Sequence, residues 1–144
     1  MGFDVTRQSA TIYDDGAEQF TGTTLEGIGQ SVVGVLQNPK ETANRFVKVL
    51  SIKTSQNEIL AAFQRATGSE WETERSTTES LLESGRKKLQ EGSGGWVLDL
   101  VVAQLFDKGQ ARCVVAPSRE ESDSELLGVV WETADDIVAK VLKP

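Results

Sequence analysis

The spacing of apolar positions predicts four helices, and each begins beside a side chain that can cap it. In a capping box, a hydroxyl accepts a hydrogen bond from the third helical amide, and a carboxylate accepts one from the amide of the cap residue. Apolar residues at intervals of three and four follow each box, as in an amphipathic helix. The capping pairs are Thr23 with Glu26, Ser55 with Glu58, Ser76 with Glu79 and, in a weaker version, Thr133 with Asp136. The apolar stripes are Leu25, Ile28, Val32, Val35 and Leu36; Ile59, Leu60, Phe63 and Ala66; Leu81, Leu82, Gly85 and Leu89; and Ala134, Ile137, Val138, Val141 and Leu142.

The stretches between the helices predict strands. Residues 9–13 alternate as in a short strand, residues 14–16 (Asp-Asp-Gly) indicate a turn, and residues 18–20 are the expected returning strand of a hairpin. Residues 45–52 are apolar on both faces, which is typical of an internal strand. Residues 70–75 alternate carboxylates with larger side chains, which predicts an exposed edge strand. The helix between the last two strands predicts a parallel crossover.

The C-terminal part of the chain has one strongly apolar segment. Residues 96–106 are interrupted only by Asp99 and Gln104, and we expect a buried helix there. Residues 112–116 form a strand or an apolar loop, and residues 117–125 form a polar loop. The whole pattern predicts one α/β domain over residues 1–144, with more helix than strand.

Composition and charge indicate which partners and which cellular location to expect. The 144 residues carry 15 basic and 22 acidic side chains, a net charge of −7, so nucleic acid and anionic membranes are not expected as partners. The basic run at residues 86–88 is too short to change this and fits a solvated helix face. No apolar run reaches the ~18 residues of a membrane span, and we expect a cytoplasmic protein.

The residue types available for catalysis are few. The chain has no histidine, which removes the usual general base and the commonest metal ligand. Its one cysteine, Cys113, has no histidine partner and is expected to be a small buried hydrophobe. Tyr13 lacks a lysine four residues later, where Ala17 stands, so a Tyr-x-x-x-Lys pair is absent. No metal site is predicted.

Two local patterns have a functional and a structural interpretation. Gly27-Ile28-Gly29 resembles the start of a dinucleotide-binding loop, but Val32 stands where the third glycine belongs, and the segment follows a helix cap instead of a strand. We therefore expect close helix packing there. The carboxylates of Glu70, Glu72 and Glu74 suggest a cation site, but solvated edge residues are the better interpretation.

The segment at residues 96–106 holds the best candidate site. Asp99 lies in its first turn. A carboxylate there either has a raised pKa and transfers protons, or has a structural role in which it complements the helix dipole or faces a hydrogen-bonding partner. It is the one candidate catalytic residue. Trp96, Asp99, Leu100 and Gln104 are the predicted lining of a substrate pocket for a small molecule. Trp96, Phe106 and Trp131 serve equally well as pocket walls or as core.

Several segments of the chain together match a known pattern. They are residues 10–16 (ATIYDDG), Phe20, residues 23–29 (TTLEGIG), 41–46 (ETANRF), 55–62 (SQNEILAA), 66–68 (ATG) and 125–128 (ELLG). These segments resemble fungal NmrA-like, isoflavone-reductase-like proteins, an atypical branch of the short-chain dehydrogenases/reductases. The resemblance covers most of the chain and is weakest at residues 107–124.

This resemblance implies an NAD(P)-binding Rossmann-like fold of which the chain is the C-terminal, substrate-side portion. The glycine loop and the lysine implicated in catalysis belong to an N-terminal half that we expect to be missing here. We therefore expect no cofactor in this chain, NADPH being implied only for a full-length member, and no competent reductase alone. If the sheet of the full fold continues into that half, the predicted strand around residues 46–52 lacks neighbours here and its apolar faces are open. We therefore expect a homo-oligomer or a Rossmann half as partner.

Two other functions stay open at this point, and so does whether the chain is an enzyme at all. One is a cofactor-free isomerase, cyclase or lyase of secondary metabolism, in which a carboxylate such as Asp99 would transfer the proton. The other is a regulatory protein-interaction module, since NmrA-like proteins include regulators, and a nuclear location would then fit.

Overall fold

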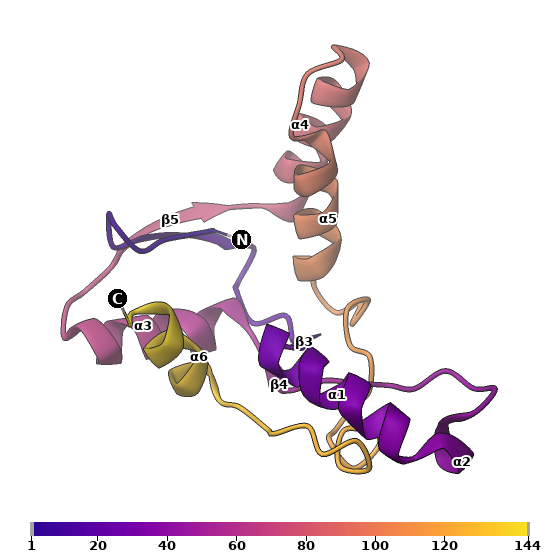
Figure 1. Cartoon of the computed structure of the whole chain (residues 1–144). Coiled ribbons are helices and arrows are strands. Elements are labelled where there is room, and N and C mark those ends of the chain that lie inside the picture. Colours follow the sequence, from indigo (N-terminus) through magenta and orange to yellow (C-terminus); the bar gives the residue numbers. More distant parts are fainter. Residues whose placement is uncertain (1, 144) are drawn as a thin grey trace. The chain divides into compact units, whose positions relative to one another are not determined.

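Each of the two units of this computed structural model is formed by two stretches of chain that are far apart in the sequence (Figure 1). The structure describes residues 2–143. The first unit contains residues up to 20 and residues 55–113, and the second contains residues 21–54 and those from 114 onward. The helices and strands form a small α/β arrangement with more helix than strand, which confirms the predicted fold class.

A three-stranded sheet lies in the first unit, in the order β1 (Phe3–Asp4), β2 (Ser9–Tyr13) and β5 (Glu72–Ser76). β2 pairs antiparallel with β1 and parallel with β5. β5 is an exposed edge strand, as its charges predict. The predicted hairpin is wrong, because β3 (Phe20–Gly22) pairs with β4 (Ile52–Thr54) and not with β2. The parallel partner of β5 is likewise β2, and not residues 45–52.

Helix α3 (Gln56–Thr67) follows the sequence prediction closely. Ser55 and Glu58 form the complete capping box, and the helix ends at Gly68, whose φ of 64° is left-handed. The buried Gln56 side chain joins this helix to β2, since its Oε1 accepts from the amide of Tyr13 at 2.9 Å and its Nε2 donates to the carbonyl of Thr11 at 3.1 Å.

Two helices lie side by side in the first unit, α4 (Thr78–Gln90) and α5 (Trp96–Phe106) (Figure 1). They approach closely at Gly85, where a Cβ would lie 2.9 Å from Cδ2 of Leu100. The cap of α4 is Thr77, one residue later than predicted. α5 is only half buried, against the prediction of a wholly buried helix. Its inner face packs in a core with Phe20, and its outer face is exposed; the inner residues are Val102, Ala103 and Phe106, and the outer ones are Val97, Leu98 and Val101.

The second unit contains α1 (Leu25–Gln37), α2 (Pro39–Thr42) and α6 (Ala134–Val141). The cap of α1 is Thr24 and not Thr23, whereas Thr133 and Asp136 form the full box that we expected in a weaker version. α1 presents glycines to the rest of its unit. A Cβ at Gly27 would lie 3.3 Å from Cβ of Ser51, and one at Gly34 would lie 2.6 Å from Cα of Leu127.

The predicted internal strand at residues 45–52 is wrong except at its end, where β4 begins. Residues 46–50 have no regular structure, and Phe46 is almost fully exposed. Residues 119–125 take the place of a neighbouring strand. The amides of Lys48 and Leu50 donate to the side chains of Asp123 and Ser124 at 2.8 and 3.0 Å.

Candidate functional site

The second unit contains a buried carboxylate, that of Glu132. Glu132 is 6% exposed, and its Oε2 accepts a hydrogen bond of 2.6 Å from the hydroxyl of Thr24, the cap residue of α1. The backbone of Glu132 also donates to the carbonyl of Ser51 at 2.8 Å, and the Ser51 hydroxyl accepts from the amide of Thr24 at 3.0 Å. One cluster therefore joins the start of α1, the end of the 46–51 segment and the residue that precedes the cap of α6.

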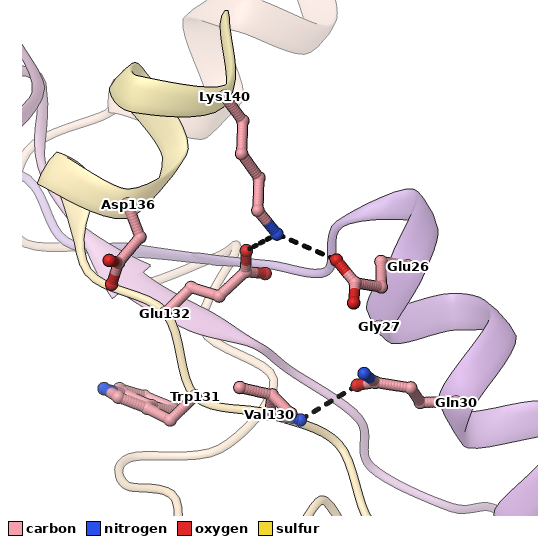
Figure 2. A pocket seen from close by; sticks show the side chains of 8 residues that line it. All are labelled: Glu26, Gly27, Gln30, Val130, Trp131, Glu132, Asp136 and Lys140. Carbon is pink, nitrogen blue, oxygen red and sulfur yellow. Dashed lines mark hydrogen bonds and ion pairs between the residues drawn. The ribbon is translucent and has the colours of Figure 1, made fainter.

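Lys140 in α6 completes the cluster. Its Nζ lies 2.6 Å from Oε1 of Glu132 and 2.9 Å from Oε2 of Glu26 (Figure 2). Burial alone would raise the pKa of Glu132, but hydrogen bonds from Lys140 and Thr24 outweigh it and lower this pKa. The hydrogen bonds that Lys140 donates, to Glu132 first and to Glu26 second, raise the pKa of Lys140. Both groups are therefore charged at neutral pH.

These residues line a cavity of about 230 Å³. Figure 2 shows the lining residues: Glu132, Asp136 and Lys140 on one side and Glu26 and Gln30 of α1 on the other, with Trp131 at the lower left of the view. Oε1 of Gln30 accepts from the amide of Val130 at 2.9 Å, which fixes its amide group against this wall.

The chemistry available in the cavity is hydrogen bonding and stacking. Three carboxylates and one ammonium face it, and an ionised carboxylate is a hydrogen-bond acceptor only. The pKa of Asp136 is also lowered, because its Oδ2 accepts hydrogen bonds from the amide and the hydroxyl of Thr133, the cap residue of α6. The site can thus hold a small polar ligand against the Trp131 indole, but the lowered pKa values of Glu132 and Asp136 mean that neither carboxyl group is poised to donate a proton at neutral pH.

The predicted site on α5 lies in the first unit. Asp99 lines a smaller cavity of about 140 Å³ with Tyr13, Leu81, Leu98 and Val102. Its Oδ2 accepts from Lys88 Nζ at 2.7 Å and from the Ser84 hydroxyl at 3.0 Å. Asp99 therefore has hydrogen-bonding partners, as the structural alternative for this residue expected. The bond from Lys88 is the main cause that lowers the pKa of Asp99, and burial, Asp99 and Glu74 raise the pKa of Tyr13.

The other predicted pocket residues do not gather around Asp99. Leu100 packs against Gly85 between α4 and α5. Trp96 is half buried at the start of α5, and Gln104 is exposed. Of the aromatic candidates, Phe106 is core, stacked on Tyr13 at 5.8 Å between ring centroids. Trp131 lines the cavity of Glu132.

The remaining candidates have structural surroundings. Gly27 is closely packed as predicted, whereas Gly29 has open space beside it. Cys113 is partly buried against the core around Phe106. Within residues 2–143, no group of three or more potential metal ligands comes together, and no helix is long and apolar enough to cross a membrane.

Sequence reasoning missed the cluster of Glu132, Lys140 and Thr24. Glu132 and Lys140 are eight residues apart and flank a capping box, but nothing local indicates that Glu132 is buried. Its burial depends on Thr24 and Ser51, which are distant in the sequence. One signal was available: Glu132 directly follows an apolar run at residues 129–131 and precedes a cap.

Comparisons with known proteins give the wider relationship. Oxidoreductase poxI of Penicillium oxalicum is 67% identical over 143 residues, which are 99% of this chain and 46% of that protein. Oxidoreductase aprR of Aspergillus flavus is 27% identical over 148 residues, with 99% and 48% covered. This chain is similar to part of proteins named oxidoreductase. It spans about half the length of the curated relatives it matches.

A solved structure shows the same fold. A nucleoside-diphosphate-sugar epimerase from Staphylococcus aureus matches with a TM-score of 0.61 and 18% identity, over 93% of this chain and 44% of that chain. The predicted Rossmann-like α/β fold is therefore confirmed for this portion of such a chain. No protein-family model matches the sequence.

Proposed function

We propose that this chain is the substrate-side part of an NmrA-like, isoflavone-reductase-like oxidoreductase that uses NADPH. Under this proposal it binds the coenzyme only together with a polypeptide equivalent to the half of its relatives that it does not match. The observation that carries the proposal is the 67% identity to a protein named oxidoreductase, which extends over 99% of this chain but only 46% of that protein.

The surroundings of the glycine pair support the proposed need for a second polypeptide. A dinucleotide pyrophosphate is held by free backbone amides in a glycine turn between a strand and a helix. Here Gly27 and Gly29 lie inside α1, and the Gly27 amide already donates to the Thr24 hydroxyl at 3.2 Å. Ser51 also closes the space in front of Gly27. The packing around Gly27 therefore leaves no room for a pyrophosphate at this glycine, which supports the proposal.

Substrate contact in this chain is proposed at the cavity beside Asp99 and at the cavity beside Glu132. The first has apolar walls with a phenol and a carboxylate, and suits a mainly apolar molecule that bears a hydroxyl. The second is polar with one indole wall. Trp96, Leu100 and Gln104 stay proposed contacts on α5, outside the small cavity.

The alternative of a cofactor-free isomerase or lyase gains no support from Asp99. Proton transfer at neutral pH needs a carboxyl group with a raised pKa. The pKa of Asp99 is lowered, chiefly by the hydrogen bond from Lys88. No observation therefore favours this second function.

Calorimetric titration of NADPH tests the proposal. The 144-residue chain alone should give no binding in the micromolar range. The chain co-purified with the unmatched polypeptide of the Penicillium oxalicum relative should bind NADPH with a micromolar Kd. Micromolar binding by the chain alone, or none by the co-purified pair, would contradict the proposal.

A further inference from the structure

Helix α1 has an inverted distribution of side chains. Its buried residues are Gly27 and Gly34, which lie against Ser51 and Leu127. On the other side of the helix are five exposed apolar side chains, Leu25, Ile28, Val32, Val33 and Leu36, which we call the outer face of α1. Leu25 is 88% exposed and Leu36 is 75% exposed.

Such a face is unusual on a helix that meets only water. A surface helix normally buries its apolar stripe and exposes polar residues. Contiguous apolar patches on a soluble chain mark interaction sites far more often than scattered single residues do. The outer face continues over the whole helix, from its first residue to its penultimate one, and Gly29 lies within it with open space beside it.

Three comparisons indicate what covers this face. The chain matches 46% and 48% of two relatives and 44% of the epimerase chain. Each of those proteins therefore carries roughly as much polypeptide again, outside the matched part. We propose that the outer face of α1 is the docking surface for the polypeptide equivalent to that unmatched half, whether joined to this chain or separate.

This inference rests on the proposed function, because the same polypeptide is the proposed coenzyme-binding part. It goes further by placing the interface on one helix. A second copy of this chain is the main competing occupant. Two copies would each bring a net charge of −7, which disfavours their association.

The chain contains a matched control for a test by substitution. Val32 in the outer face and Val101 in the outer face of α5 are both 56% exposed. Val32→Glu and Val101→Glu make the same chemical change at equal exposure, and neither position is enclosed in its own unit. Leu36→Glu is a second variant of the outer face of α1.

The first experiment is co-expression of the full chain with the tagged, unmatched polypeptide of the Penicillium oxalicum relative, followed by affinity capture and light scattering. A charge placed in an apolar interface is left unpaired, so Val32→Glu and Leu36→Glu should weaken the complex about tenfold or more. Val101→Glu should leave it unchanged. Circular dichroism should show the same helix content in all three variants.

A second measurement does not depend on a separate fragment. Hydroxyl-radical footprinting compares this chain alone with the full-length Penicillium oxalicum relative. The side chains aligned with Leu25 and Leu36 should be oxidised several-fold more slowly in the full-length relative.

Each outcome of these experiments supports or contradicts the proposal that the outer face of α1 is a docking surface. Equal oxidation rates, equal effects of the variants on α1 and α5, or a homodimer of the chain that Val32→Glu disrupts would overturn it. A complex that forms through α1 but does not bind NADPH would contradict the proposed function and leave the docking surface intact.

Discussion

Nζ of Lys140 lies 2.6 Å from Oε1 of Glu132, and the two side chains of this ion pair are 49% and 7% exposed. The pair is thus buried at its carboxylate end only. A buried carboxylate is stable when its oxygens are hydrogen-bonded, and Thr24 satisfies the second oxygen. The Lys140 side chain remains about half exposed to water.

This asymmetry predicts how stability depends on pH. Because the folded-state pKa of Glu132 is lowered, its ionised form stabilises the fold above the unfolded pKa of about 4.3, and this contribution is lost as pH falls through the folded pKa. Glu132→Gln should lower the free energy of unfolding by about 1–3 kcal/mol at pH 7. In urea unfolding, the difference from wild type should shrink between pH 5 and pH 3.

The control for this prediction is Glu26→Gln. Glu26 contacts the same lysine but is exposed, and a surface change of this kind should stay within about 0.5 kcal/mol. A Glu132→Gln effect that is independent of pH would contradict the prediction.

Two glycines in α1 should respond oppositely to alanine. At Gly34 a Cβ would lie 2.6 Å from Cα of Leu127, a backbone atom that cannot move alone, so Gly34→Ala should destabilise by about 1–3 kcal/mol. At Gly29 nothing lies within 4 Å, and alanine is the better helix former. Gly29→Ala should therefore stabilise by about 0.5–1 kcal/mol. Thermal unfolding of both variants checks this, and a shift of Tm in the same direction would disprove it.

Asp123 should anchor the polar loop to residues 45–48. Its carboxylate accepts two bonds from the Arg45 guanidinium, at 2.7 and 3.1 Å, and one from the Lys48 amide at 2.8 Å. Asp123→Asn removes the charge and should cost about 1–3 kcal/mol in urea unfolding. Asp4→Asn is the control, because the ion pair of Asp4 with the Arg7 guanidinium is exposed and 3.8 Å long, and an asparagine Oδ1 can still accept the 3.0 Å bond from the Arg7 amide. An effect within about 0.5 kcal/mol is expected. Equal effects of the two substitutions would be evidence against an anchoring role.

These contacts also explain which elements the sequence could predict. The boxes at Ser55 and Thr133 are local, since each involves residues three apart, and the structure confirms both. The caps of α1 and α4 are displaced by one residue, to Thr24 and Thr77, because adjacent hydroxyls compete for the same role.

The wrong strand predictions all concern partners that are distant in the sequence. Residues 46–50 have the apolar pattern of a strand, but their amides are bound by Asp123 and Ser124 in a loop about 75 residues away. The pairing of β5 with β2 spans a similar distance. The same dependence on distant residues limited the prediction of the candidate sites. Asp99 could be identified from its helix, but its pairing with Lys88 could not. Glu132 could not be identified, because Thr24 and Ser51, which bury it, are distant in the sequence.

The pKa of Asp99 can be tested directly. Since the hydrogen bond from Lys88 is the largest cause that lowers this pKa, Lys88→Met should raise it. The titration of the Asp99 carboxyl carbon by ¹³C NMR gives the measurement. Lys87→Met is the matched control, because it removes the same charge from a neighbouring residue that pairs with Glu91 at 4.0 Å. An unchanged Asp99 titration in Lys88→Met would contradict the assignment.

Gln56 provides the sharpest test of the first unit. Its side chain is fully buried and satisfies two backbone groups of β2, the amide of Tyr13 and the carbonyl of Thr11. Gln56→Leu keeps the size of the side chain but leaves both groups buried without a partner, at about 1–3 kcal/mol each. Urea unfolding should therefore show a loss of about 2–5 kcal/mol, and hydrogen exchange at the Tyr13 amide should accelerate. Gln90→Leu, at an exposed position at the end of α4, makes the same substitution and should change neither quantity. If Gln56→Leu proved as stable as Gln90→Leu, β2 would be held to α3 by apolar packing alone.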